Sequence, residues 1–150
     1  MLMTGVDRVD AERAFTRMTR ARCRDAVLRT LRRAPRGSGR LAVFERPKPS
    51  RSAALPAGGG VQEVPLRQIA GTLEPGRAGL FDCCFRPAAP ARERWQRLWL
   101  AEHRGAPLPP ISVVPVGDAY AVVDGHHRVS VARARGALTI DARVQGPLAV

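Results

Sequence analysis

Lysine, aromatic residues and cysteine are all scarce in this chain of 150 residues. Lys48 stands alone beside 24 arginines, a ratio that is typical of a GC-rich genome. The three cysteines, Cys23, Cys83 and Cys84, form no C-x-x-C pair, which speaks against a disulfide framework or a zinc knuckle. We therefore expect Cys83 and Cys84 to be small core residues rather than redox groups.

Long apolar runs are also missing. No stretch approaches the roughly 20 apolar residues that a membrane-spanning helix needs, and residues 1–13 contain no apolar segment of a secretion signal. We expect a cytoplasmic protein without a membrane span on these grounds. The apolar fraction of 45% is sufficient for the core of one compact domain with an appendage.

Positive charge is in excess, and it is unevenly distributed. The formal net charge is +12. Residues 1–60 carry 14 Lys and Arg against 5 Asp and Glu, a net charge of +9, whereas residues 61–150 carry 11 against 8, a net charge of +3. A surface for a negatively charged partner would therefore belong to the first part of the chain.

Residues 1–33 are predicted to form a basic amphipathic helix, because residues 8–33 contain neither Pro nor Gly. Its apolar positions suggest one stripe that packs on the domain or on a second copy in a homodimer: Ala11, Ala14, Phe15, Met18, Ala21, Val27, Leu28 and Leu31. The alternative is an arm that binds DNA, RNA or an acidic membrane surface. Nucleic acid would then be held by Arg13, Arg17, Arg20 and Arg24.

Residues 34–60 are rich in Pro, Gly and Ser and are predicted to be a linker. Residues 61–150 have the regular pattern of a domain. Its predicted elements are a strand at 61–69, a helix at 91–103, strands at 111–116 and 120–123 joined by a turn, a helix at 129–135 and a strand at 139–144. This β-α-β-β-α-β order predicts an α+β fold with a small mixed sheet. Trp95 and Trp99 are expected in the core, and Arg133 and Arg135 in solvent.

The segment Asp124-Gly125-His126-His127-Arg128 lies where a predicted strand turns into a helix. The first turn of a helix has backbone N–H groups without acceptors and the positive end of the helix dipole, so it binds phosphate readily. Arginine adds a two-pronged donor, and histidine can donate a charge-assisted hydrogen bond. Adjacent histidines point in different directions, so we expect no metal site. Asp124 either caps the helix or acts on the ligand.

Two segments resemble the ParB/sulfiredoxin fold, in particular the N-terminal domain of ParB-type partition proteins. Residues 105–113 are similar to the entry into that family's hairpin, and residues 125–132 are similar to its phosphate-binding box. The likeness covers residues 61–145, and it is greatest to small bacterial ParB-like proteins with an Asp-Gly-His-His-Arg box. It implies a bound nucleotide, which is CTP in ParB proteins and ATP in sulfiredoxins.

The resemblance also implies roles for single residues. Gly125 would let the backbone approach the phosphates, and His126, His127 and Arg128 would form the phosphate-binding box. Because His126 stands where sulfiredoxins have their catalytic cysteine and ParB proteins a glutamate, we expect no sulfiredoxin activity, and ParB-like CTP hydrolysis is not implied. Asp124 is the candidate catalytic residue, and it would hold Mg²⁺ or accept a proton from an acceptor hydroxyl.

The sequence thus leaves three functions open. The first is binding of a nucleoside di- or triphosphate (CTP, ATP or ADP, with Mg²⁺) through residues 124–128, either alone or with phosphohydrolase or small-molecule kinase activity. The second is a partition-like accessory protein that binds DNA or RNA through the basic N-terminal helix. The third is a non-catalytic interaction module.

Overall fold

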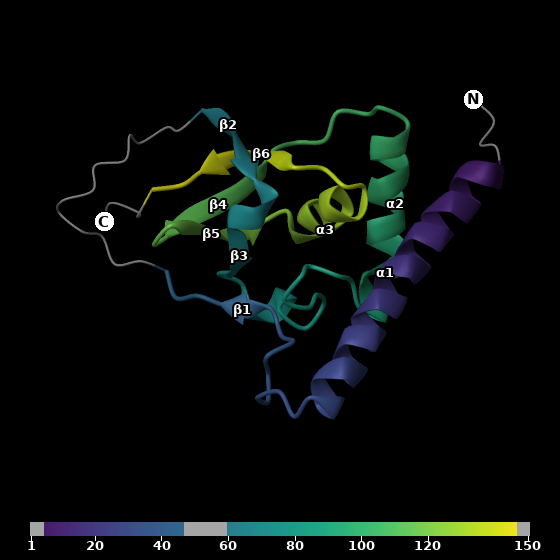
Figure 1. Ribbon diagram of the computed structural model, residues 1–150. Helices are drawn as coiled ribbons and strands as arrows, with labels where there is room; N and C mark the ends of the chain where they lie inside the picture. Colours follow the sequence, from purple (N-terminus) through teal and green to yellow (C-terminus); the bar gives the residue numbers. More distant parts are fainter. Residues whose placement is uncertain (1–4, 47–59, 147–150) are drawn as a thin grey trace.

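A mixed sheet and three α-helices make up the described part of the chain, residues 5–46 and 60–146 of a computed structural model (Figure 1). The helices are α1 (Gly5–Leu31), α2 (Arg92–His103) and α3 (His126–Ala134). The strands are β1 (Ala42–Val43), β2 (Val61–Pro65), β3 (Ile69–Thr72), β4 (Ile111–Val116), β5 (Ala119–Asp124) and β6 (Thr139–Val144). The predicted α+β fold with a long helix ahead of a small mixed sheet is confirmed.

The sheet has the strand order β1-β3-β5-β4-β6-β2. β4 and β5 form an antiparallel hairpin in which Val116 pairs with Ala119, so Gly117 and Asp118 form the predicted two-residue turn. β3 runs parallel to β5, and β6 runs parallel to β4. The carboxyl end of β5 therefore lies between its two neighbours in the sheet, and α3 begins directly after it.

The strand predicted over residues 61–69 is in fact two strands. Pro65 has no N–H to donate, and the ladder between β2 and β6 ends there. The 3-10 helix η1 (Leu66–Gln68) then carries Leu66 into the core before β3 begins. Arg133 holds this corner, because its guanidinium donates to the carbonyl oxygens of Leu66 and Ile69 at 2.8 and 3.0 Å. The prediction that Arg133 is solvated was wrong; Arg135 is exposed as predicted.

Part of the predicted linker over residues 34–60 belongs to the fold. Leu41 is buried in the main core, and β1 pairs with β3 in parallel at the edge of the sheet. Burial of one leucine and pairing of an open strand edge outweigh the Pro/Gly-rich composition around them. Residues 47–59, which include the Gly-rich end of the linker, lie outside the described residues.

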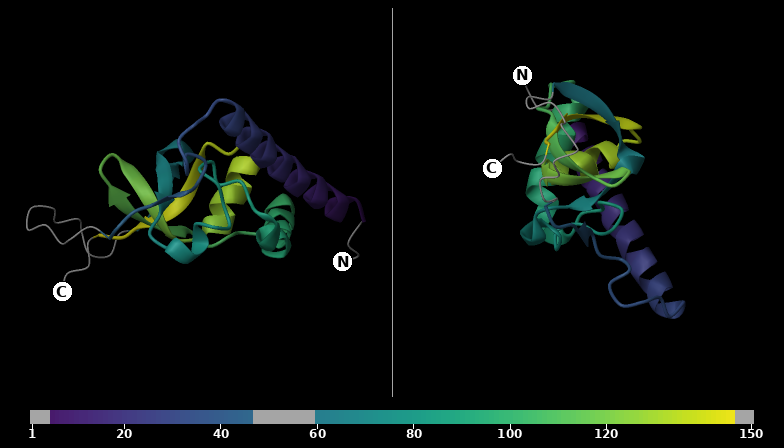
Figure 2. Two further views of the ribbon diagram at one scale, coloured as in Figure 1. Left: turned by 90° about the horizontal axis from the view of Figure 1, so that it is seen from below. Right: turned by 90° about the vertical axis from the view of Figure 1, so that its left-hand side faces the viewer.

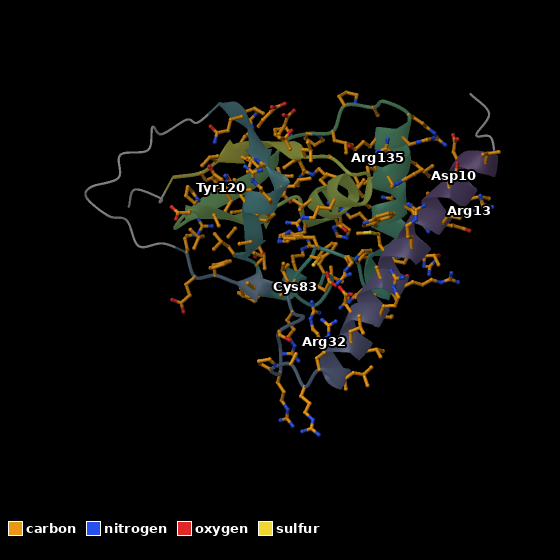
Figure 3. All side chains as sticks on the ribbon, viewed as in Figure 1. Asp10, Arg13, Arg32, Cys83, Tyr120 and Arg135 are labelled. Carbon is orange, nitrogen blue, oxygen red and sulfur yellow. The ribbon has the colours of Figure 1, made fainter. Side chains whose placement is uncertain are left out.

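The turn between Phe81 and Phe85 explains why the two adjacent cysteines are not core residues. Both phenylalanine rings are buried, whereas in the intervening turn Cys84 is exposed and Cys83 is half-buried. Figure 3 labels Cys83 in this turn. The Asp82 carboxylate stabilises this turn by accepting hydrogen bonds from backbone N–H groups within it. The prediction of buried cysteines was wrong because the phenylalanines occupy the core positions.

Trp95 joins the three helices in a second, smaller core. Its indole N–H donates to the Ser130 hydroxyl of α3 at 2.8 Å, and its ring meets Phe15 of α1 edge-on at 5.5 Å. Both rings are fully buried, and Trp99 is buried beside them. The tryptophans are core residues as predicted, and they hold α1 against α2 (Figure 1).

The second half of α1 extends beyond the sheet and the other helices (Figure 2, right). Val27, Leu28 and Leu31 are 58%, 44% and 74% exposed, so the prediction that they continue the buried stripe was wrong. At 100° per residue Leu31 lies on the side of the helix opposite Ala11 and Phe15 and Val27 lies close to Leu31, whereas Leu28 lies about a third of a turn from Ala11 and Phe15. None of the helices in the described ranges is long and apolar enough to cross a membrane.

The contact between Phe15 and Trp95 predicts how firmly α1 is held. Replacing Phe15 with Ala removes a fully buried ring and should lower the free energy of unfolding by about 3–5 kcal/mol in chemical denaturation. The matched control is Leu31→Ala in the exposed half of the same helix, with an expected change within about 0.5 kcal/mol. Equal effects of the two substitutions would show that α1 is not anchored at Phe15.

Candidate functional site: the cavity at the start of helix α3

Gly125 joins β5 to α3 in a backbone conformation that favours glycine, with a φ of 104°. A Cβ atom at this position would overlap the Ile111 side chain at the start of β4. The turn and the close packing therefore both require glycine. The turn and the packing against Ile111 place the first turn of α3 close to the sheet. The positions of residues 126–128 are fixed as a result.

Asp124 and Arg128 form an ion pair across this turn. The Arg128 Nη2 atom donates to Asp124 Oδ2 at 2.9 Å, and Nη1 donates to the carbonyl oxygens of Pro109 and Pro110 at 2.5 and 2.7 Å. Asp124 does not cap α3, because Gly125 is the N-cap residue and no side chain caps the helix. The cap interpretation was wrong, since the carboxylate is held by the guanidinium instead. Arg128 thus ties α3 to the segment before β4.

His126 and His127 are both buried. The His126 Nε2 atom lies 2.6 Å from the Thr72 hydroxyl oxygen, and the His127 ring meets Phe81 edge-on at 5.1 Å. Burial is the main cause that lowers the pKa of each imidazole to about 4, and the positive charges of Arg77 and Arg94 contribute. Both rings are neutral at pH 7, so a charge-assisted hydrogen bond from either histidine would depend on the charge of the acceptor.

A cavity of about 280 Å³ opens at the start of α3. All five residues of the predicted box line it, which are Asp124, Gly125, His126, His127 and Arg128. The structure therefore brings the predicted residues together at one cavity. Their individual roles toward a ligand stay predictions.

Two arginines that the sequence did not single out complete this cavity. Arg77 comes from the 3-10 helix η2 (Pro75–Arg77), and Arg94 comes from α2. Neither side chain forms a hydrogen bond or ion pair within residues 5–46 and 60–146, and both are exposed. In one sequence Arg94 cannot be told apart from its neighbours Arg92 and Arg97, so only the fold reveals it.

A neighbouring cavity of about 330 Å³ shares Pro109 and Arg128 with the first one but has the opposite charge. Glu63, Glu102 and Asp141 line it. Carboxylates repel phosphate, so the cavity at the start of α3 is the better anion site of the two.

Metal ligands are few at the candidate site. The described residues contain no group of three or more His, Cys, Asp and Glu side chains that could hold a metal ion. Glu74 and Asp124 both line the cavity. Mg²⁺ is commonly bound by one or two carboxylates together with the phosphates of a nucleotide, so these two residues fit such an ion only when phosphates are present.

The fold and the site define an α+β protein with a cationic cavity at a strand–helix turn. No model of a known protein family matches the chain, and no curated protein matches it either. Among solved structures, sulfiredoxin from Arabidopsis thaliana is similar, at 20% sequence identity and a TM-score of 0.44 over 58% of this chain and 85% of that chain. A likeness at this level says nothing about activity or ligand.

The turn at Gly125 leads to the first prediction for the site. Gly125→Ala should lower the free energy of unfolding by about 2–4 kcal/mol, because it adds left-handed strain and overlap with Ile111. Gly136 also has a positive φ, of 74°, but a Cβ atom added there would have no atoms within 4 Å. Gly136→Ala is therefore a control for the backbone strain alone, and we expect it to lower the free energy of unfolding by about 1 kcal/mol. Equal losses in urea denaturation would show that the Ile111 contact does not matter.

The buried histidines predict a pH dependence of stability. Their folded pKa of about 4 is below the unfolded value of 6.5, so the unfolded chain binds more protons between these values. The contribution of the two neutral imidazoles to the free energy of unfolding is therefore fully present above pH 6.5, and it is lost as the pH is lowered toward 4. From pH 7 to pH 5 we expect a loss of about 2 kcal/mol for each imidazole, and on the order of 4 kcal/mol for the two together, measured by urea denaturation.

A double variant separates this effect from other titrating groups. His126→Gln/His127→Gln should flatten the pH dependence of the free energy of unfolding between pH 7 and pH 5. A slope that survives in the double variant would assign the proton uptake to other residues.

Proposed function

We propose that the cavity at the start of α3 binds the phosphates of a nucleoside di- or triphosphate. The main support for this proposal is the pair Arg77 and Arg94, which come from two different elements and line the same cavity as residues 124–128. Neither arginine has an anionic partner among the described residues. Guanidinium groups without partners beside a helix N-terminus favour an anionic ligand with several oxygen atoms.

Backbone donors add to this positive charge. The first intrahelical hydrogen bond of α3 runs from the Val129 N–H to the Gly125 carbonyl at 3.0 Å. The N–H groups of residues 126–128 therefore have no acceptor within the helix. Because α3 follows β5 without a side-chain cap, these donors are available to phosphate oxygens.

Arg128 stabilises the cavity mainly through its hydrogen bonds to other residues of the protein. Its guanidinium already donates to two proline carbonyls and to Asp124, so most of its hydrogen-bonding capacity is used. It holds the cavity wall at Pro109 in place and contributes positive charge. In this proposal Arg77 and Arg94 make the direct phosphate contacts that the sequence assigned to Arg128.

Hydrolysis or transfer of a phosphate would need a group that accepts a proton. The candidates at the cavity are the Asp124 carboxylate and the two neutral imidazoles. Asp124 is the most accessible of these, since its side chain is 69% exposed. Mg²⁺, held by Asp124 and Glu74, would neutralise charge on the phosphates. We propose binding as the primary function, and any reaction would proceed through Asp124.

The test is calorimetric titration of the protein with CTP, ATP and ADP in the presence of Mg²⁺. Arg77→Gln/Arg94→Gln should raise the Kd of the bound nucleotide by at least about tenfold, because each guanidinium donates charge-assisted hydrogen bonds to the phosphates. Both positions are exposed, so the variant is expected to fold.

The matched control is Arg67→Gln/Arg97→Gln, which removes the same charge at exposed positions outside the cavity. It should bind like the wild type. Absence of binding by the wild-type protein, or equal Kd values for the two variants, would rule out a nucleotide site at this cavity.

A further inference from the structure

A second cationic cavity, of about 470 Å³, lies between the exposed half of α1 and the turn that follows it. We call it the arginine groove. It is lined by five arginines: Arg22, Arg29, Arg33, Arg36 and Arg40. Figure 3 shows the end of α1 beside this groove, with Arg32, the residue that follows the helix, labelled.

The arginine groove carries more positive than negative charge. Asp82 is the acidic residue in its lining, and its carboxylate is already bound. One oxygen accepts from the backbone N–H groups of Cys84 and Arg86, and the other accepts from Arg86 Nε at 2.8 Å. Arg86 pairs with both Asp82 and Asp25, and Asp25 also interacts electrostatically with Arg29. Within residues 5–46 and 60–146, however, none of the five groove arginines forms an ion pair with a carboxylate, so the groove keeps an excess of positive charge.

Hydrogen-bond donors in the groove are equally short of acceptors. The Arg22 Nη1 atom is buried and has no hydrogen-bond partner among the described residues. Arg29 donates only to the Cys83 sulfur, a weak acceptor, at 3.1 Å. The side chains of Arg33, Arg36 and Arg40 form no hydrogen bond or ion pair within residues 5–46 and 60–146. A buried donor without an acceptor costs free energy, which an oxygen-rich anion would recover.

The geometry favours an anion that repeats along a line. Arg22 and Arg29 lie on one face of α1 seven residues apart, which is about 10 Å along the helix axis, and Arg33 follows in the turn after the helix ends at Leu31. Arg36 and Arg40 face them from the following turn. Nucleic acid carries a regular row of phosphates with spacings of a few ångströms, so it can meet several of these guanidinium groups at once.

The rest of the lining argues against a protein partner and against base recognition. Apart from the arginines and Asp82, it consists of Ala, Thr, Pro, Gly and Ser residues. It contains no large apolar side chain to anchor a protein partner and no aromatic ring on which a base could stack. What the groove offers is contact with the phosphate backbone alone.

We infer that the arginine groove binds the phosphodiester backbone of duplex nucleic acid without sequence preference. This site differs from the one predicted from the sequence, because Arg13, Arg17, Arg20 and Arg24 lie on the opposite face of α1. That outward face is partly neutralised, since Glu12 lies within it and Arg13 pairs with Asp10 at 3.9 Å. The arginine groove is also separate from the nucleotide cavity at α3, since the two cavities share no lining residue.

The experiment compares three variants of the full chain by fluorescence anisotropy with two unrelated 20-base-pair DNA duplexes over a range of salt concentrations. The groove variant is Arg33→Gln/Arg36→Gln/Arg40→Gln. The outward-face variant is Arg17→Gln/Arg20→Gln/Arg24→Gln, which removes the same charge from the outward face of the adjoining helix α1. The third, Arg77→Gln/Arg94→Gln, tests the nucleotide cavity. All of these positions are exposed.

We expect the groove variant to lose at least about tenfold in affinity for both duplexes and to show a shallower salt dependence, by about 0.9 in log–log slope for each lost phosphate contact. The other two variants should change the affinity less than threefold. Equal loss in the groove and outward-face variants, greater loss in the outward-face or cavity variant, sequence-dependent affinity, or absence of wild-type binding would each overturn the inference. Nucleotide binding measured in parallel reports on the other site separately.

Discussion

The packing of Gly125 against Ile111 is the constraint on which the site depends. Because position 125 carries no side chain and adopts a positive φ, β5 can end at the sheet surface and α3 can begin at once. This places the imidazole of His126 against Thr72 of the neighbouring strand β3. It also lets Arg128 reach the carbonyl oxygens before β4. One residue without a side chain thus sets the positions of the three that follow it.

The cavity that results has an unusual charge state. Two imidazoles face it, but burial and the nearby Arg77 and Arg94 keep both neutral at pH 7. The positive potential comes instead from guanidinium groups, which stay charged at every physiological pH. An anion that enters the cavity would offset the repulsion that lowers the histidine pKa values. Ligand binding and histidine protonation are therefore coupled, and each should favour the other.

Much of the fold could be predicted because local signals and burial agree. The strand at 139–144 and the turn at residues 117 and 118 follow from alternation and from Gly-Asp, and Trp95 and Trp99 are buried as large apolar residues usually are. The box at 124–128 could be found because its residues are consecutive. The exposed Val27 and Leu31 show the opposite case, in which apolar residues lie on a helix face that no other described residue buries.

The remaining features depend on contacts between distant segments. Arg133 has a helical position typical of a solvated residue, yet it binds two carbonyl oxygens of a corner more than sixty residues earlier. Arg77 and Arg94 reach the cavity from separate elements, and no spacing in one sequence indicates it. Leu41 could not be assigned to the core from a Pro/Gly-rich surrounding. Such residues acquire their roles only when the chain is folded.

The most direct measurement of the central claim is the proton NMR titration of the His126 and His127 imidazoles with and without ADP and Mg²⁺. Without nucleotide, both should titrate with a pKa near 4, well below that of an exposed histidine. With nucleotide, both pKa values should rise, because phosphate placed beside the rings stabilises their charged form. Histidines that titrate near 6.5 in the free protein, or whose pKa values do not change at saturating nucleotide, would contradict a phosphate site at the start of α3.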